Sequence, residues 1–265
     1  MTTSENATNH HASGDLFLTL SGQHSRRRLL KSAVAGTTGI AAGIAGLGML
    51  SALPAQARTP VLPQNNTCLD QLQTIFDIAA TGEQLAVTFY KNGVDHHDQL
   101  GLQGANLAFL QAVVVVEQFH QQFFVGLGGK PATDLFSFPH GEQTFQRLDL
   151  FIDTLMQLEG IFVSALLAAI KEFAQLQRPD LAQIAGELVA VQDEHRAVGR
   201  YIGGLQPASN WAFAPAQLPS VGAAPGALEA DGFLSPKDGN RFQYQPVSTQ
   251  DAGVLFTQPF AVSCS

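Results

Sequence analysis

Four stretches of this chain place carboxylates or histidines on helix faces that are otherwise apolar. A buried carboxylate without a partner is very costly, so several in one core require a group that neutralises them. For a mixture of carboxylates and imidazoles, a pair of divalent metal ions is the simplest such group. The sequence therefore predicts helices packed around a charged centre. The residues concerned are Glu83, Glu117, His120, Glu159, Gln192 and His195.

Apolar residues recur with helical spacing in four long segments. We predict helices over residues 69–91, 105–127, 142–177 and 179–205. Pro179 then stands in the first turn of the last helix, where proline is tolerated. A connection of about a dozen residues joins the second and third helices and spans up to about 40 Å when extended, roughly the length of a bundle. This length permits a single long crossover between the two halves of a four-helix bundle.

In a four-helix bundle, a dimetal site takes one Glu from each of two helices and a Glu-x-x-His pair from each of the other two. The i,i+3 spacing of such a pair puts both side chains on one helix face. The fourth helix lacks a complete pair, because Gln192 stands three residues before His195. We expect Glu159 to bridge the two ions. The predicted ligand set is Glu83, Glu117, His120, Glu159 and His195, with Gln192 at its edge.

Other polar residues near this set have simpler interpretations. Asp193 and Glu194 are expected on a solvated face, with Glu194 as the substitute carboxylate if the helical register differs. Tyr90 lies two turns from Glu83 on the same face and is interpreted as a rim residue, with a redox neighbour as the alternative. No role is assigned to the loop histidines. These are His96, His97 and His140.

The order of these groups resembles the ferritin-like superfamily, and more closely the secreted bacterial ferritin-like domain proteins, which include desiccation-related proteins. Residues 82–90 (GEQLAVTFY) and 117–120 (EQFH) carry the resemblance, which covers about residues 69–205. It implies an all-α fold, a ferritin-like antiparallel four-helix bundle with one long crossover. An irregular Pro/Gly-rich tail that packs on the bundle is expected after it, with short strands at 242–245 and 254–257 as low-ranking candidates.

Three Glu and two His also resemble the ligand set of dimanganese catalases, in which the sixth position serves as an outer group. The resemblance implies two divalent metal ions, Mn or Fe, and redox chemistry on peroxide, dioxygen or Fe(II). The enzyme would then be catalase-like or ferroxidase-like. The alternative is a non-enzymatic metal-binding or stress and desiccation-protection protein with a degenerate site, which Gln192 favours. Glu117 and His120 could also form a buried pair that needs no metal.

The N-terminal part of the chain resembles a bacterial Tat signal peptide. Residues 25–31 (SRRRLLK) match the twin-arginine pattern, an apolar run follows, and residues 55–57 (AQA) form an A-x-A cleavage signal. We expect cleavage near Arg58 and a periplasmic or secreted protein without stable membrane insertion. The alternative is an uncleaved anchor, because the apolar run reaches the roughly 20 residues that span a bilayer.

Charge and length restrict the partners of the mature chain. The predicted domains are residues 1–57 as signal peptide, 58–206 as bundle and 207–265 as tail. Removing the signal takes away four of the 14 basic and two of the 22 acidic residues, so the net charge changes from −8 to −10. Such a charge argues against nucleic acid or an anionic membrane as partner. The sequence leaves open a homo-oligomer and a disulfide between Cys68 and Cys264.

Overall fold

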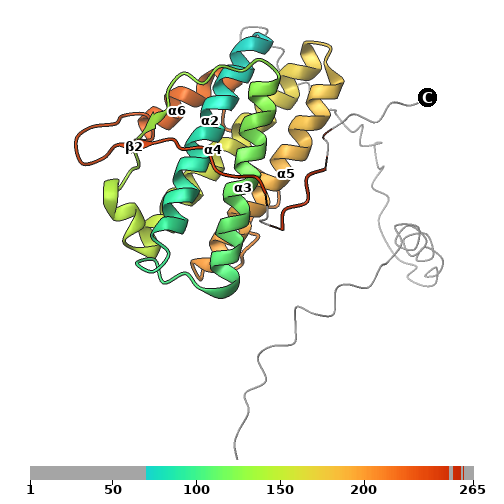
Figure 1. Ribbon diagram of the computed structural model, residues 1–265. Helices are drawn as coiled ribbons and strands as arrows, with labels where there is room; N and C mark the ends of the chain where they lie inside the picture. Colours follow the sequence, from blue (N-terminus) through green and yellow to red (C-terminus); the bar gives the residue numbers. More distant parts are fainter. Residues whose placement is uncertain (1–69, 251–252, 258, 260–265) are drawn as a thin grey trace, which may run out of the picture. The chain divides into compact units, whose positions relative to one another are not determined.

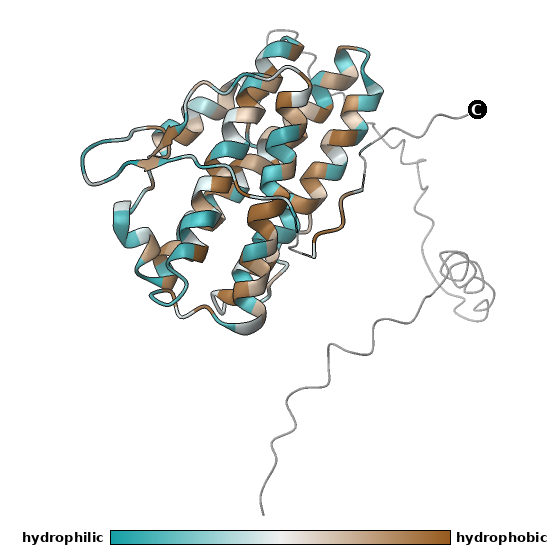
Figure 2. Ribbon diagram, in the orientation of Figure 1, coloured by the Kyte–Doolittle hydropathy of each residue, from teal (hydrophilic) through white to brown (hydrophobic). Residues whose placement is uncertain are grey.

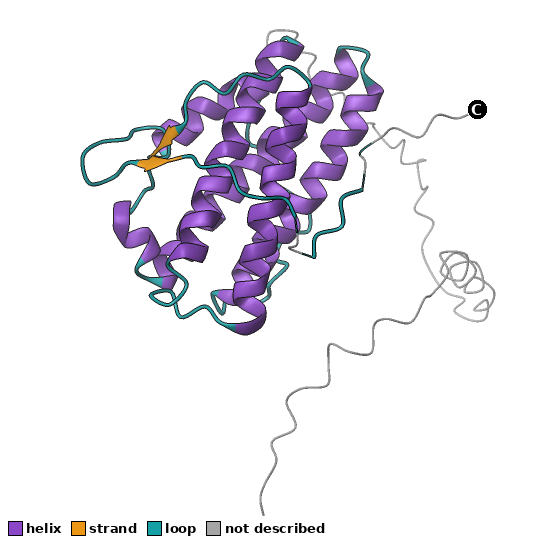
Figure 3. Ribbon diagram, viewed as in Figure 1, coloured by secondary structure: helices purple, strands orange, loops and turns teal. Residues whose placement is uncertain are grey.

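A computed structural model of the 265-residue chain describes residues 70–250, 253–257 and 259. The predicted signal peptide, Cys68 and Cys264 lie outside the described residues. Four long helices form a bundle, as Figures 1 and 3 show, which confirms the predicted all-α ferritin-like fold. The helices are α2 (Leu72–Asp95), α3 (Gly104–Gly126), α4 (Leu148–Gln175) and α5 (Pro179–Ile202).

The direction of the helices follows from contacts at the two ends of the bundle. Phe76 near the start of α2 packs on Phe173 near the end of α4, with ring centroids 6.2 Å apart. At the opposite end, Phe89 stacks on Phe151 at a centroid distance of 4.6 Å. The helices α2 and α4 are therefore antiparallel. Because α2 also pairs with α3 through a short turn, α3 and α4 run in the same direction, and residues 127–147 form the predicted long crossover.

The crossover is more structured than the sequence suggests. It contains strand β1 (Leu135–Phe136) and the short helix η1 (Gly141–Phe145). The prediction of a continuous helix from residue 142 is wrong, because α4 begins only at Leu148 after an extended Arg147. Phe145 explains the break: its ring is buried against Phe89 and Phe138, and a continuous helix would move it away from them.

The tail also contains regular elements. These are η2 (Val221–Ala223), α6 (Ala224–Ala230) and β2 (Phe242–Gln243), which pairs antiparallel with β1. Of the two candidate strands, only the first is present, and residues 254–257 form no strand. After β2 the tail crosses α2 and α3 towards α5 (Figure 1). Tyr244 fixes this path, because its hydroxyl donates to Oε1 of Gln118 at 3.0 Å.

Apolar side chains of all four helices form the core, and polar residues gather on the outer faces (Figure 2). The helix α4, with 28 residues and a mean hydropathy of 1.6 over its most apolar window, is long and apolar enough to cross a membrane. Its carboxylates Glu159 and Glu172 are both fully buried. Glu172 accepts hydrogen bonds from the backbone N–H groups of Asp70 and Val221, each at 2.9 Å. These features are those of a core helix in a polar-centred bundle.

Gly199 lets α4 and α5 pack closely beside the buried centre. A Cβ at this position would lie 2.5 Å from Cδ2 of Leu155, which is fully buried. We expect Gly199→Ala to lower the free energy of unfolding by about 1–3 kcal/mol, because Leu155 must leave its packed position. Gly186→Ala on the same helix is the control, since its Cβ meets nothing within 4 Å. Urea denaturation measures both; equal effects would contradict the close approach.

Candidate metal centre

The structure brings the six predicted site residues together near the middle of the bundle. One comes from α2, two from α3, one from α4 and two from α5. Glu117, Glu159 and Gln192 are fully buried, and His195 is 4% exposed. Each residue therefore lies on the core-facing side of its helix, as its apolar neighbours predict. The full set is Glu83, Glu117, His120, Glu159, Gln192 and His195.

Glu117 is the central member of this cluster. Its Oε2 lies 3.1 Å from Nδ1 of His120, one turn away on the same helix. Its Oε1 lies 2.9 Å from Nδ1 of His195 on α5. The side-chain amide of Gln192 donates to Glu117 Oε2 at 3.1 Å. One carboxylate is thus in contact with both histidines and with the residue that replaces the missing Glu.

The donor atoms fall into two groups that share Glu117. The first group contains Glu83, Glu117 and His120, and the second contains Glu117, Glu159 and His195. Within each group, the ligand atoms lie within 4.8 Å of one another. The expectation that Glu159 bridges two ions is not supported by this geometry, because Glu159 belongs to one group only. Glu117 has two carboxylate oxygens and is the residue that can contact two ions at once.

Unpaired oxygens in the cluster test whether metal ions fit. Buried oxygens of three carboxylates have no hydrogen-bond partner among the described residues. For Glu117, the 2.9 Å approach of His195 Nδ1 does not have hydrogen-bond geometry. Buried acceptors are normally satisfied, so three orphans in one place indicate a missing positive partner. Oxygen and imidazole donors suit Mn or Fe. The three atoms are Glu83 Oε2, Glu117 Oε1 and Glu159 Oε2.

The same crowding shifts the acidities of the three carboxyl groups. Burial raises the pKa of Glu159 to about 8. Burial and the neighbouring Glu117 raise the pKa of Glu83 well above its ordinary value. Burial also acts against ionised Glu117, but His195 and His120 outweigh it and lower its pKa. Without metal, Glu159 therefore holds a proton at neutral pH, and the raised pKa of Glu83 favours its protonated form. A cation that binds there must displace such protons.

Tyr90 is part of the centre and does not lie at its rim. The interpretation as a rim residue is wrong, because Tyr90 is fully buried. Its hydroxyl donates a short hydrogen bond to Oε1 of Glu159. Its ring also packs edge-on to His195, with centroids 6.1 Å apart. The helical spacing of seven from Glu83 was the available signal, since it points both residues to the same core.

The remaining polar residues named from the sequence lie apart from the centre. Nε2 of His140 is 3.0 Å from Asp153 on the exposed start of α4. Asp193 lies 3.9 Å from Arg196, and Glu194 is exposed. Neither Asp193 nor Glu194 belongs to a donor group. The register that places Gln192 and His195 inward therefore needs no substitute carboxylate.

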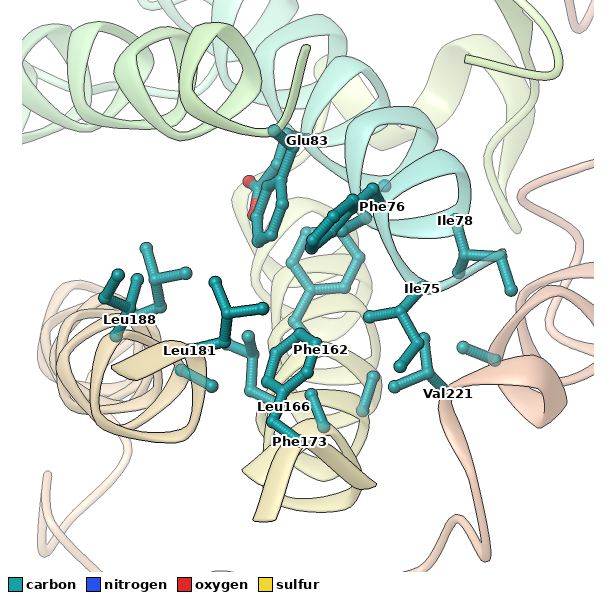
Figure 4. A pocket seen from close by; sticks show the side chains of 18 of the residues that line it. Ile75, Phe76, Ile78, Glu83, Phe162, Leu166, Phe173, Leu181, Leu188 and Val221 are labelled. Carbon is teal, nitrogen blue, oxygen red and sulfur yellow. The ribbon is translucent and has the colours of Figure 1, made fainter. Parts of the chain in front are cut away.

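A small apolar cavity adjoins the centre on the side of Glu83. Its volume is about 60 Å³, and its walls come from all four helices. Figure 4 shows Glu83 at one edge of this cavity, which apolar side chains such as Phe76, Phe162 and Leu166 line. Apolar walls give the Glu83 carboxyl no hydrogen-bond donor, which agrees with its unpaired Oε2. The cavity thus contributes to the burial that raises the pKa of Glu83.

Comparison with known proteins identifies the family to which the chain belongs. A search of curated proteins and a search of solved structures each gave no match. A family model described as the ferritin-like domain matches residues 72–204, which is half of the chain. The matched residues run from the start of α2 to just beyond the end of α5 and include every member of the cluster. The chain is therefore a member of the ferritin-like domain family.

Proposed function

We propose that this protein binds two divalent metal ions, Mn or Fe, at the shared carboxylate of Glu117. One observation supports this most strongly: two buried donor groups, each with an imidazole and two carboxylates, have Glu117 in common. Glu83 and His120 would complete one site, and Glu159 and His195 would complete the other. Titration of the metal-free protein with Mn(II) or Fe(II) is expected to end at two ions per chain.

The proposed activity is redox chemistry on peroxide, dioxygen or Fe(II). Two bound Mn or Fe ions supply a two-electron change between them. The protein keeps water from the carboxylates, because Glu83, Glu117 and Glu159 are almost wholly buried. Tyr90 orients Glu159 by its hydrogen bond, and Gln192 orients Glu117. Peroxide decay and Fe(II)-dependent oxygen uptake, measured on the metal-loaded protein, test the activity. If neither is detected, the redox activity is excluded and only the metal-binding function remains.

The second candidate is a metal-binding or stress-protection protein without turnover. The observation that favours it is Gln192, whose amide donates to Glu117 where the full six-ligand pattern has a carboxylate. Three carboxylates carry a charge of −3, which does not balance two divalent ions. A site with this deficit holds its metals less tightly than one with four carboxylates.

Gln192→Glu tests whether this position limits the site. We expect the variant to keep or tighten metal binding, because the added charge balances two divalent ions. Without metal the variant is expected to be less stable, since a second carboxylate then lies against Glu117. Isothermal titration with Mn(II) measures the first effect and urea denaturation the second. Asp193→Asn, on the same helix, is the control and is expected to change little. Loss of metal from Gln192→Glu would exclude the site as described.

The proposal includes export to the periplasm or beyond. The support is the arrangement of residues 25–31 and residues 55–57, which lie outside the described residues. Export of a folded chain would let the metals bind in the cytoplasm first. N-terminal sequencing of the exported protein is expected to give a first residue near Arg58. A sequence that starts at Met1 or Thr2 would contradict cleavage.

A further inference from the structure

A groove between α3 and α5 leads from the surface to the two histidines of the centre. Its volume is about 420 Å³. His120 and His195 are among its lining residues, and their Nδ1 atoms face the carboxylates of the cluster. The imidazole rings therefore separate the buried carboxylates from the groove. Anything held in the groove would lie next to the centre on its histidine side.

The outer wall of the groove comes from the tail. Residues 254–257 and Pro259 line it together with the two helices. Phe256 packs on Phe119 of α3, with ring centroids 4.9 Å apart. Figure 2 shows this stretch of the tail as a hydrophobic segment close to α5. The tail thus encloses apolar space beside the histidines.

The groove is larger than an access path for small oxidants needs to be. A water molecule occupies about 30 Å³ in the liquid, and dioxygen or peroxide needs little more. A volume of about 420 Å³ falls within the roughly 300–1,000 Å³ of sites that bind organic molecules. Neither a peroxide nor a metal ion on its way to the centre requires this space.

The chemistry of the walls defines the ligand class. Most lining side chains are apolar, among them Val116, Leu188 and Val191. The charged residues at the rim are Glu187 and Glu194, both exposed, and no Lys or Arg occurs among the described lining residues. Carboxylates at the rim repel anions. Inside the rim most walls are apolar and do not replace the water shell of a cation. An uncharged apolar molecule satisfies both conditions.

We propose that this groove binds an uncharged, apolar organic molecule with one end against the rings of His120 and His195. The proposal deepens the proposed function, because it places an organic substrate beside the metal centre. Binding itself depends on the walls of the groove and not on the metals. The two proposals therefore fail separately: a metal titration tests the centre, and ligand binding to the metal-free chain tests the groove.

The test uses 2-phenyl-2-propanol as an uncharged probe and 2-phenylpropanoate as an anionic probe of similar size. Methyl-labelled full-length protein is titrated with each probe in two forms, metal-free and loaded with Zn(II). Zn(II) takes the place of Mn(II) because it causes no paramagnetic broadening. The expected result is saturable shifts of the Val116, Leu188 and Val191 methyls with the alcohol in both forms. The anion is expected to bind at least about tenfold more weakly. Equal binding of both probes, or no shifts at these methyls, would overturn the proposal.

A pair of variants on α3 locates the binding. Ala112 lines the groove, whereas the neighbouring Gln111 is exposed and does not. Ala112→Trp fills the groove and is expected to weaken binding of the alcohol by at least about tenfold. Gln111→Trp is the control and is expected to leave the affinity within about twofold. Circular dichroism checks the fold of both variants. If Ala112→Trp does not fold, the methyl shifts of the unchanged protein decide alone.

Discussion

Replacing Glu117 with glutamine is expected to abolish the binding of both metal ions. Glu117 is the carboxylate that both donor groups share, so one substitution removes a charged ligand from two sites. Glutamine has nearly the same shape, and the fold is expected to survive. Loss of an outer partner of a metal ligand already costs about 10–100-fold in affinity. Loss of a shared charged ligand is therefore expected to weaken both sites by more than about 100-fold.

Two further variants distinguish the loss of a ligand that both sites share from a general loss of negative charge. Glu83→Gln changes a residue of one group only, so the second site is expected to keep a bound ion. Glu194→Gln removes the same charge next to His195, but its side chain is exposed and outside both groups. It is expected to bind two ions. Metal analysis after gel filtration gives the number of ions per chain. Two ions retained by Glu117→Gln would contradict its shared role.

Removing the metals is expected to destabilise the protein, and more so as the pH rises. The pKa of Glu159 is raised from 4.5 to about 8 by burial, and the pKa of Glu83 is raised too. Between pH 4.5 and about pH 8, the folded metal-free chain therefore binds more protons than the unfolded chain. Its stability therefore falls as the pH rises, by roughly 2–4 kcal/mol between about pH 5 and 8.

Of the two other titrating groups with shifted pKa values in the cluster, His195 acts in the same direction and Glu117 has no effect at neutral pH. The pKa of His195 is raised, because Glu117 outweighs the opposite effect of burial. Its contribution to stability is present at low pH and is lost as the pH rises through the folded pKa. The lowered pKa of Glu117 acts only below its ordinary value of 4.5. It therefore does not offset the trend at neutral pH.

Bound metal ions are expected to reverse this pH dependence. They hold the carboxylates ionised, so fewer protons compete as the pH rises. An ion at about 1,000 times its Kd adds about 4 kcal/mol of stability. Urea denaturation at pH 5.5 and pH 8, after chelation and after addition of Mn(II), measures the difference. A metal-free protein that becomes more stable towards pH 8 would show that its carboxylates are already solvated or paired.

Helical spacing predicted most of the fold and the positions that meet in the core. In a helix, Glu117 lies on the same face as Val113 and Phe124. Because these two apolar side chains are expected in the core, the Glu117 side chain is expected to be buried with them. The i,i+3 step then places His120 beside Glu117. These are local relations, and the sequence contains them directly. They were sufficient to predict which six residues the structure brings together.

Relations between distant residues could not be predicted in the same way. The choice of Glu117 over Glu159 as the shared carboxylate depends on side-chain distances across four helices. The start of α4 depends on Phe145, which is held by aromatic rings from α2 and the crossover. The path of the tail depends on single contacts such as Tyr244 with Gln118. Residue periodicity contains no information on any of these contacts.

A crystal structure of the Mn(II)-loaded protein, with anomalous scattering recorded at the manganese edge, tests the proposed centre most directly. We predict two anomalous peaks inside the bundle, with the Glu117 carboxylate in contact with both. One peak is expected beside Glu83 and His120, and the other beside Glu159 and His195. A single peak, peaks away from Glu117, or no peak in a fully folded protein would contradict the dimetal centre.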